Sequence, residues 1–348
     1  MELVLTGKTQ FEQKGLILLK HRLQFAGKKL IRIGILLLGV SILTFLLMQA
    51  SPLDPLQTNV GQTALGSMSQ EQIAQLEAYW GVNTPPVQRY LGWLDGVLHG
   101  DFGISLLYRQ PVLEVIGIRL ANSIWMLAAA WILSGLLGFL LGVLAGTFRG
   151  RLPDRLIRGY CLLISSTPAF WLAILLLLIF SVALGWLPVG LSVPLGMDAA
   201  SVTVTDHLRH AILPVLTLSI TGVSNIALHT REKMIEILKS DFILFARAKG
   251  ETWRSIILRH GIHNVLLPAM TLQFASISEI IGGSVLVEQV FSYPGLGQAA
   301  VTAGLGSDLP LLLGITVITA SIVFIGNLAA DLLYGVIDPK IRRRSAKS

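Results

Sequence analysis

Long apolar runs separated by shorter polar segments dominate the pattern along the 348 residues. A membrane-spanning helix needs about 20 mostly apolar residues, and six runs are long enough. They lie at residues 30–49, 123–147, 160–186, 211–228, 265–287 and 309–336. The fourth run is the weakest, because Asn225 and several serines and threonines dilute it. The pattern therefore predicts an all-α integral membrane protein with six transmembrane helices.

Composition agrees with this expectation. The chain is 53% hydrophobic and only 14% charged, whereas a soluble protein carries about a quarter charged residues. Its net charge of +7 is spread over segments that flank the apolar runs, so we expect no nucleic-acid partner. The single cysteine, Cys161, lies in an apolar run and excludes an internal disulfide and a thiolate metal cage.

The distribution of basic residues predicts the orientation in the membrane. Lysines and arginines gather before the first run, after the second, after the fourth and in the tail, whereas residues 51–120 carry no lysine, three arginines and six acids. The positive-inside rule then places both termini in the cytoplasm. We expect five parts: a basic cytoplasmic extension (1–28), a first transmembrane helix (29–50), an external segment (51–118), a core with five transmembrane helices (119–336) and a basic cytoplasmic tail (337–348).

Two local patterns predict how helices pack and bend. The second run has a small residue every four positions, at Ser134, Gly138, Gly142 and Gly146. Such a face lets another helix approach closely, although glycine is also simply frequent in membrane helices. Pro168 in the third run predicts a bend, with the preceding Ser-Ser-Thr bonding the freed carbonyl groups.

A few polar or small residues inside the apolar runs are candidates for a transport pathway or a subunit interface. Glu279 is ionisable and well inside the fifth run, and Gly282 and Gly283 follow it. An intramembrane carboxylate is by default a functional hypothesis, the alternative being a structural hydrogen bond to a neighbouring helix. Asn225 is a further candidate in the fourth run. The motif FSYPGLGQ at 291–298 forbids a continued helix, so the chain must turn or re-enter there.

Catalytic motifs are missing from the sequence. It contains no HExxH, no GxSxG and no paired carboxylates in a predicted cleft. Gly7-Lys8-Thr9 resembles the end of a P-loop, but the earlier glycine is missing. His207 and His210 have a spacing that could bind a metal weakly, and a satisfied or solvated pair is favoured. We expect a chain that is not an enzyme and holds no cofactor and no metal.

The one long charge-rich segment of the C-terminal half is SDFILFARAKGETWRSIILRHGIHNVLLP, at 240–268. Its apolar spacing predicts two short helical pieces, broken at Gly250. One interpretation is a solvated loop between two membrane helices. The other is a docking element for a cytoplasmic partner.

The same segment carries a family resemblance. FARAKG followed by RHGIHNVLLP resembles the cytoplasmic loop of binding-protein-dependent ABC transporter permeases, in the dipeptide, oligopeptide and nickel branch. Collinear similarities extend over 29–343 and include SPLDP, GDFGISLLYRQPV, SSTPAFWLA, LVEQVFSYPGLGQ and DLLYGVIDPKIR. Leu244, Phe245 and Ala246 stand where the general loop motif has Glu-Ala-Ala, and this departure is typical of the peptide/nickel branch.

The resemblance implies a type I ABC importer permease, with a coupling helix between the fourth and fifth transmembrane helices. Such a chain forms a translocation pathway for short peptides, or for nickel or a nickel chelate, in a bacterial or archaeal cell (inner) membrane. The implied partners are a second homologous permease, two ABC ATPase subunits that hydrolyse ATP, an extracytoplasmic solute-binding protein and membrane lipid. The implied ATPase-coupling residues are Phe245, Ala246, Arg247, Ala248, Lys249, Gly250 and Trp253.

A rival from another class is a secondary transporter or channel that works without an ATPase. Such a protein should show internal repeats or more intramembrane charges, and neither is clear in this sequence. A membrane enzyme is a third and more distant alternative, because no catalytic constellation is found.

Overall fold

The computed structural model describes residues 31–194, 196 and 202–337. The extension expected at 1–28 and all but the first residue of the tail expected at 337–348 lie outside this part. Within it every extended regular element is a helix, and one isolated bridge pairs Ile104 with Pro111. The predicted all-α fold class is confirmed.

Four helices in the described part are long and apolar enough to cross a membrane. They are Ile31–Gln49, α6 (Val112–Thr147), α9 (Val204–Leu238) and α15 (Leu309–Ile337). α6 begins within the segment expected to be external, so the boundary predicted at residue 118 falls inside a continuous helix.

Two further spans are bent. The first joins α7 (Leu152–Ser165) to α8 (Ala169–Leu177) and the π-helix η1 (Leu178–Ala183), with a bend of 102°. The second runs through α11 (Trp253–Ser255), the π-helix η3 (Ile256–Ile262) and α12 (His263–Ala275) into α13 (Ile277–Val290), with a bend of 46°. If each bent pair is one span, the described residues contain the six spans that the pattern predicts.

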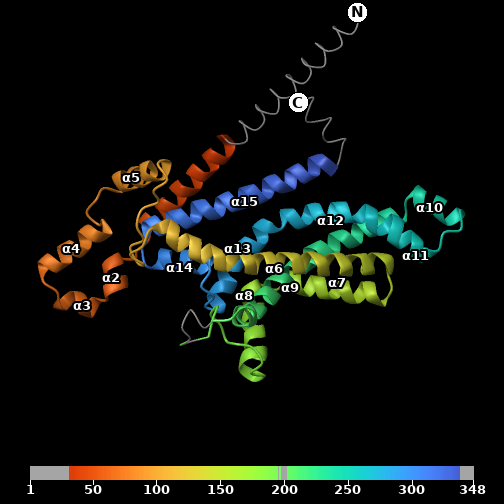
Figure 1. The fold of residues 1–348 in the computed structure, drawn as a ribbon, viewed down its shortest axis with the longest axis horizontal. Coiled ribbons are helices and arrows are strands. Elements are labelled where there is room, and N and C mark those ends of the chain that lie inside the picture. Colours follow the sequence, from red (N-terminus) through yellow and green to blue (C-terminus); the bar gives the residue numbers. More distant parts are fainter. Residues whose placement is uncertain (1–30, 195, 197–201, 338–348) are drawn as a thin grey trace, which may run out of the picture.

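The sharper bend lies at Pro168, as predicted. The Ser166 and Thr167 hydroxyls donate to the carbonyl oxygens of Leu162 and Leu163 at 2.9 and 2.8 Å. The Thr167 bond satisfies the Leu163 oxygen, which has lost the Thr167 amide at the break, whereas the Leu162 oxygen also keeps its bond from the Ser166 amide. The third apolar run is therefore not a straight helix: α8 leaves the direction of α7 and projects from the bundle (Figure 1).

The stripe of small residues packs α6 against α9, also as predicted. A Cβ atom built on Gly142 would lie 2.5 Å from Thr230 Cβ and 2.7 Å from the Ala227 carbonyl oxygen. One built on Gly146 would lie 2.6 Å from Met234 Cβ. Because real Cβ atoms do not approach so closely, only glycine allows the backbones of α6 and α9 to lie at this separation.

Short helices form the segment between the first helix and α6. They are α2 (Pro55–Val60), α3 (Gln62–Ser67), α4 (Gln70–Trp80) and α5 (Pro86–Leu98). α4 starts with a capping box between Ser69 and Gln72 and stops at Gly81, whose φ is +65°. These four helices lie at one end of the molecule, and α10 (Asp241–Ala248) with α11 lies at the other (Figure 1).

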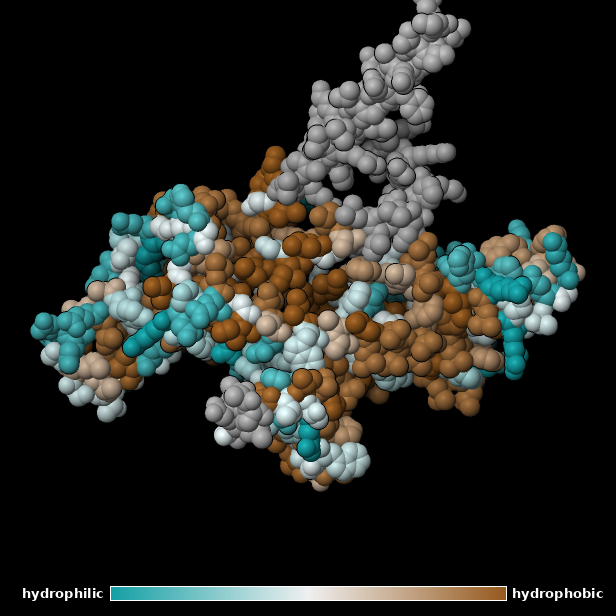
Figure 2. Space-filling model, viewed as in Figure 1, coloured by the Kyte–Doolittle hydropathy of each residue, from teal (hydrophilic) through white to brown (hydrophobic). Residues whose placement is uncertain are grey.

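The surface between the two ends is apolar. Figure 2 shows hydrophilic residues over α2–α5 and over α10–α11, with a wide hydrophobic band between them. We name these the α2–α5 end and the α10–α11 end. A protein in water rarely exposes so large an apolar surface, so the band is the part that membrane lipid or another apolar surface covers.

Candidate functional site

The predicted break in the charge-rich segment is present as the α10–α11 turn, residues 240–255. Ser240 precedes α10, and its hydroxyl donates to the Ile237 carbonyl oxygen at 2.6 Å. Gly250 has a φ of +83°, a conformation that glycine adopts without the steric cost other residues meet. Thr252 then caps α11 by accepting a hydrogen bond from the Ser255 amide.

The inner face of the turn is apolar and holds α10 in place. Ile243 and Ile256 are 0% and 1% exposed, and they pack with Ala246 and Leu238 at the end of α9. Ala246, one of the residues implied to couple, therefore contacts the protein's own interior. Ala248, two residues further along the same helix, is exposed.

The outer face of the turn combines aromatic rings and cations. Phe245 is 62% exposed and Trp253 is 40% exposed. The Arg247 guanidinium lies 5.2 Å from the centroid of the Trp253 ring, and Lys249 Nζ lies 4.6 Å from that of Phe245. Cations in this range are attracted to the ring face, so the four side chains form two cation–ring pairs on the same turn. We name the two pairs together the aromatic–cationic surface.

One carboxylate ties the turn to the helix that follows it. Ser255 Oγ donates to Glu251 Oε2 at 3.2 Å, and His260 Nε2 lies 3.4 Å from Oε1. The contact with His260, aided by the Ser255 bond and the nearby Arg259, holds the pKa of Glu251 below its ordinary value. Glu251 is therefore charged at neutral pH and fastens the turn to η3.

The pathway candidates within the spans lie mostly at the surface of this chain. Glu279 and Gly282 are exposed on one side of α13, Gly283 is half-buried, and Asn225 is exposed on α9. Among the described residues Glu279 makes no side-chain hydrogen bond. The alternative interpretation, a structural hydrogen bond to a neighbouring helix, therefore has no partner within this part of the chain. Its role in a pathway or a subunit interface stays a prediction.

A second glutamate of α13, to which the sequence reasoning assigned no role, is fully buried. Glu288 is 0% exposed and accepts hydrogen bonds from Ser123 Oγ at 2.7 Å and from the Gln298 amide at 2.9 Å. Ser123 Oγ in turn accepts from the Leu296 amide at 2.7 Å. Glu288 thereby fastens the turn between α13 and α14 (Leu296–Leu305) to α6. The available signal was a carboxylate just before a turn whose amides need acceptors.

Two other buried carboxylates join segments that are distant along the chain. Asp308, 0% exposed, accepts from Ser105 Oγ at 2.5 Å and from the Leu107 amide at 3.0 Å, which holds the loop before α6 against the start of α15. Asp154, 1% exposed, binds Arg231 of α9, with Nη2 to Oδ2 at 2.9 Å. Buried charges need such partners, so these contacts serve the fold.

One histidine of the 207/210 pair has a partner within the chain. His210 Nδ1 lies 2.7 Å from the Gly190 carbonyl oxygen, which agrees with the favoured interpretation of a satisfied pair for this member. In the described ranges no group of three or more His, Cys, Asp or Glu side chains is placed to hold a metal ion.

The apolar band and the polar segments at its two ends define an integral membrane component. Comparison with known proteins identifies its family. Residues 138–343 match the family "Binding-protein-dependent transport system inner membrane component", and residues 22–123 match its N-terminal part. This chain therefore belongs to the inner membrane components of binding-protein-dependent transport systems, and the resemblance seen in the sequence is confirmed.

Several curated relatives align over most of their length. The oligopeptide transport system permease protein AppB of Bacillus subtilis is 36% identical over 309 residues, which cover 88% of this chain and 95% of AppB. The glutathione transport system permease protein GsiC of Salmonella typhimurium is 35% identical over 325 residues, covering 92% and 99%. A solved amino acid ABC transporter is 17% identical, with a TM-score of 0.46 over 66% of this chain and 94% of that one.

Proposed function

We propose that this chain is a permease subunit of an ATP-driven importer for short peptides, and that its α10–α11 turn docks an ATPase subunit. The aromatic–cationic surface is the observation that carries the docking proposal. Phe245 and Trp253 stay exposed although the same turn buries Ile243 and Ala246. Exposed aromatic rings beside arginine are typical of the anchors that protein partners bury.

The α10–α11 turn is connected to the membrane-spanning helices in a way that can transmit a movement to them. Its inner face is packed on α9, and η3 and α12 follow α11 without an intervening loop. α12 continues across the 46° bend into α13, which carries Glu279. A displacement of α10 by ATPase closure is therefore transmitted to α13, and alternating access follows from rigid-body movement of these helices.

The assembly follows from the two polar ends. We place the α10–α11 end and both termini in the cytoplasm, and the α2–α5 end outside, where a solute-binding protein delivers its ligand. A second homologous permease and two ATPase subunits complete the transporter, in a bacterial or archaeal inner membrane. Glu279, Gly282 and Asn225, exposed in the isolated chain, then face that second permease or the pathway.

The choice of peptides over nickel rests on the relatives. AppB is named for oligopeptides and GsiC for glutathione, which is itself a peptide. A putative peptide permease protein of Brucella ovis is 35% identical over 312 residues. These names favour peptides as the solute class of this chain.

The docking proposal is tested by Phe245→Ser in the complete transporter. We expect the variant to insert at wild-type amounts, because the side chain is 62% exposed, but to lose at least about tenfold of peptide uptake, as hot-spot truncations do. Leu152→Ser, at the start of α7 and 68% exposed, lies outside the aromatic–cationic surface, so it is the matched control and should keep uptake. ATPase copurification and uptake both at wild-type level in Phe245→Ser, or in a variant lacking 245–250, would refute the proposal.

The ATP-driven mode has its own test against the secondary-transporter rival. Peptide uptake is measured in proteoliposomes that contain the full complex, with ATP inside or with only an ion gradient. The proposal expects uptake with ATP alone. Uptake with the gradient and without ATP would establish the rival.

A further inference from the structure

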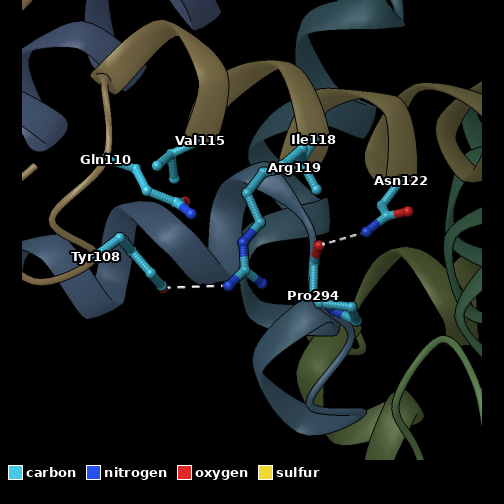
Figure 3. A pocket seen from close by; sticks show the side chains of 7 residues that line it. All are labelled: Tyr108, Gln110, Val115, Ile118, Arg119, Asn122 and Pro294. Carbon is cyan, nitrogen blue, oxygen red and sulfur yellow. Dashed lines mark hydrogen bonds between the residues drawn. The ribbon is translucent and has the colours of Figure 1, made fainter. Parts of the chain in front are cut away.

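A half-buried arginine that forms no ion pair with a described carboxylate lies at the α2–α5 end of the bundle. Arg119 on α6 faces a hollow of about 220 Å³ between the loop that precedes α6 and the turn that precedes α14. The hollow is lined by Tyr108, Gln110, Val115, Ile118, Arg119, Asn122 and Pro294, as Figure 3 shows.

The structure holds the Arg119 guanidinium in one orientation by neutral groups alone. Nη2 donates to the Tyr108 hydroxyl at 3.2 Å, and Nη1 donates to Gln298 Oε1 at 3.3 Å. The guanidinium also lies 5.3 Å from the centroid of the Tyr108 ring. Since a guanidinium has five N–H donors, these contacts position the group and leave donors for a ligand.

No carboxylate of the described residues forms an ion pair with Arg119. The buried Glu288 interacts with Arg119 only at longer range, and its oxygens accept hydrogen bonds from Ser123 Oγ and the Gln298 amide instead. Gln298 thus stands between the two charges, with its amide on Glu288 and its side chain on Arg119. Because only neutral groups accept hydrogen bonds from Arg119, its guanidinium can still form a charge-assisted pair with an anion.

The rim of the hollow adds rigid walls and another polar group. Asn122 Nδ2 donates to the Pro294 carbonyl oxygen at 3.0 Å, which joins α6 to the turn. In Figure 3 the Gln110 amide points toward the same space as Arg119. Ligand pockets for whole drug-sized molecules measure about 300–1,000 Å³, so a hollow of this size takes one end of a ligand.

We propose that Arg119 and the Gln110 amide bind the terminal carboxylate of the peptide as it enters from the α2–α5 end. The inference rests on the proposed function, because the peptide and the direction of entry come from it. Arginine donates two parallel hydrogen bonds to a carboxylate, which supplies both attraction and orientation. The free end of the peptide is thereby directed into the bundle along α6.

The test measures uptake of trialanine and of trialanine amide by the complete transporter in proteoliposomes. The wild-type complex should prefer the acid, and Arg119→Gln should lower uptake of the acid by about tenfold, the loss expected of one charge-assisted pair, while the amide is unaffected. Arg119→Lys keeps the charge without the fork and should retain part of the preference. Arg109→Gln is the matched control, since Arg109 is an exposed arginine of the neighbouring loop that does not line the hollow.

Each result decides the matter. An acid-to-amide ratio unchanged by Arg119→Gln, or an equal fall for both peptides, would overturn the carboxylate site while leaving the peptide permease in place. A loss that appears only in vesicles containing phosphatidylglycerol, and not in phosphatidylcholine alone, would assign Arg119 to a lipid headgroup instead. A wild-type complex that transports neither peptide would refute the proposed function and this inference with it.

Discussion

The α10–α11 turn and the α13–α14 turn both contain glycine and aromatic residues, but they place their aromatic side chains on opposite sides. In the first, Phe245 and Trp253 face outward and only a small apolar inner face touches the bundle. In the second, Phe291 and Tyr293 are 1% and 0% exposed.

The difference reflects where the backbone groups of each turn find partners. At the α10–α11 end water can satisfy them, so the side chains are free to form a surface for another protein. The α13–α14 turn lies within the bundle, where an unpaired amide or carbonyl is costly. There Glu288 accepts from the Gln298 amide, and Ser123 accepts from Leu296. Substitutions in the α13–α14 turn should therefore lower the stability of the protein, and substitutions in the α10–α11 turn should lower its transport activity.

The largest effect is expected for Glu288→Ala. The substitution leaves Ser123 Oγ and the Gln298 amide without their acceptor, and each unpaired buried group costs about 1–3 kcal/mol. The detergent-solubilised variant should unfold at a clearly lower temperature and accumulate poorly in the membrane. Glu279→Ala, on the exposed side of the same helix, is the matched control and should unfold like the wild type. Equal losses in both variants would contradict the anchoring role of Glu288.

A somewhat smaller loss is expected for Gly142→Ala on α6. The added Cβ meets Thr230 Cβ and the Ala227 carbonyl, and such overpacking costs about 1–3 kcal/mol. Gly117→Ala on the same helix meets nothing within 4 Å. Thermal unfolding should separate the two variants, with only Gly142→Ala destabilised. If both behave alike, the helices α6 and α9 do not need the close approach.

Gly250→Ala should have a local effect of about 1–2 kcal/mol. Its Cβ has open space, but the φ of +83° is unfavourable for any residue with a Cβ. Hydrogen exchange should become faster in residues 241–256 while the rest of the bundle keeps its protection. Gly159→Ala, in open space on α7 and without a positive φ, controls for the added methyl group. Unchanged exchange in Gly250→Ala would show that the turn does not depend on this conformation.

The smallest effect concerns the charge of Glu251. Because its pKa is lowered in the folded protein, its contacts with His260 and Ser255 stabilise the turn above the ordinary glutamate pKa and are lost as the pH falls through the lowered one. Protection factors in 251–260 should therefore decrease toward acid pH, and Glu251→Gln should remove that dependence. A wild-type turn whose protection rises on acidification would reverse the sign and refute the contact.

Much of the membrane architecture could be predicted because the physics behind it is local. Apolar length predicts a span wherever it occurs, a proline bends its own helix, and a glycine stripe allows a close approach whichever helix packs there. The bend at Pro168 and the close packing at Gly142 were predicted for that reason. The second apolar run was predicted from residue 123, and α6 continues this run back to Val112. Glu114, Arg119 and Asn122 interrupt the apolar residues there, which ends the run in the sequence but not the helix.

The three buried carboxylates could not be assigned in the same way. Each of them binds a group that is distant along the chain: Asp154 binds Arg231, 77 residues away, Glu288 binds Ser123, and Asp308 binds the Leu107 amide. Local contacts, such as that of the Gly150 amide with Asp154, are the exception. Glu279 stands out in the sequence because it is surrounded by apolar residues, yet the structure exposes it and buries Glu288 nine positions later. Hydropathy does not distinguish the two sides of a helix when both are apolar.

The class of the molecule, the two helical pieces broken at Gly250 and the family follow from the sequence alone, because apolar length, turn chemistry and motif order are properties of neighbouring residues. The folded arrangement is needed to show which residues of the broken segment face outward, which glutamate of α13 anchors its turn, and that Tyr108 and Gln298 hold Arg119 at a hollow. Those outcomes depend on contacts between distant segments, and burial and hydrogen bonding are settled only when the segments meet.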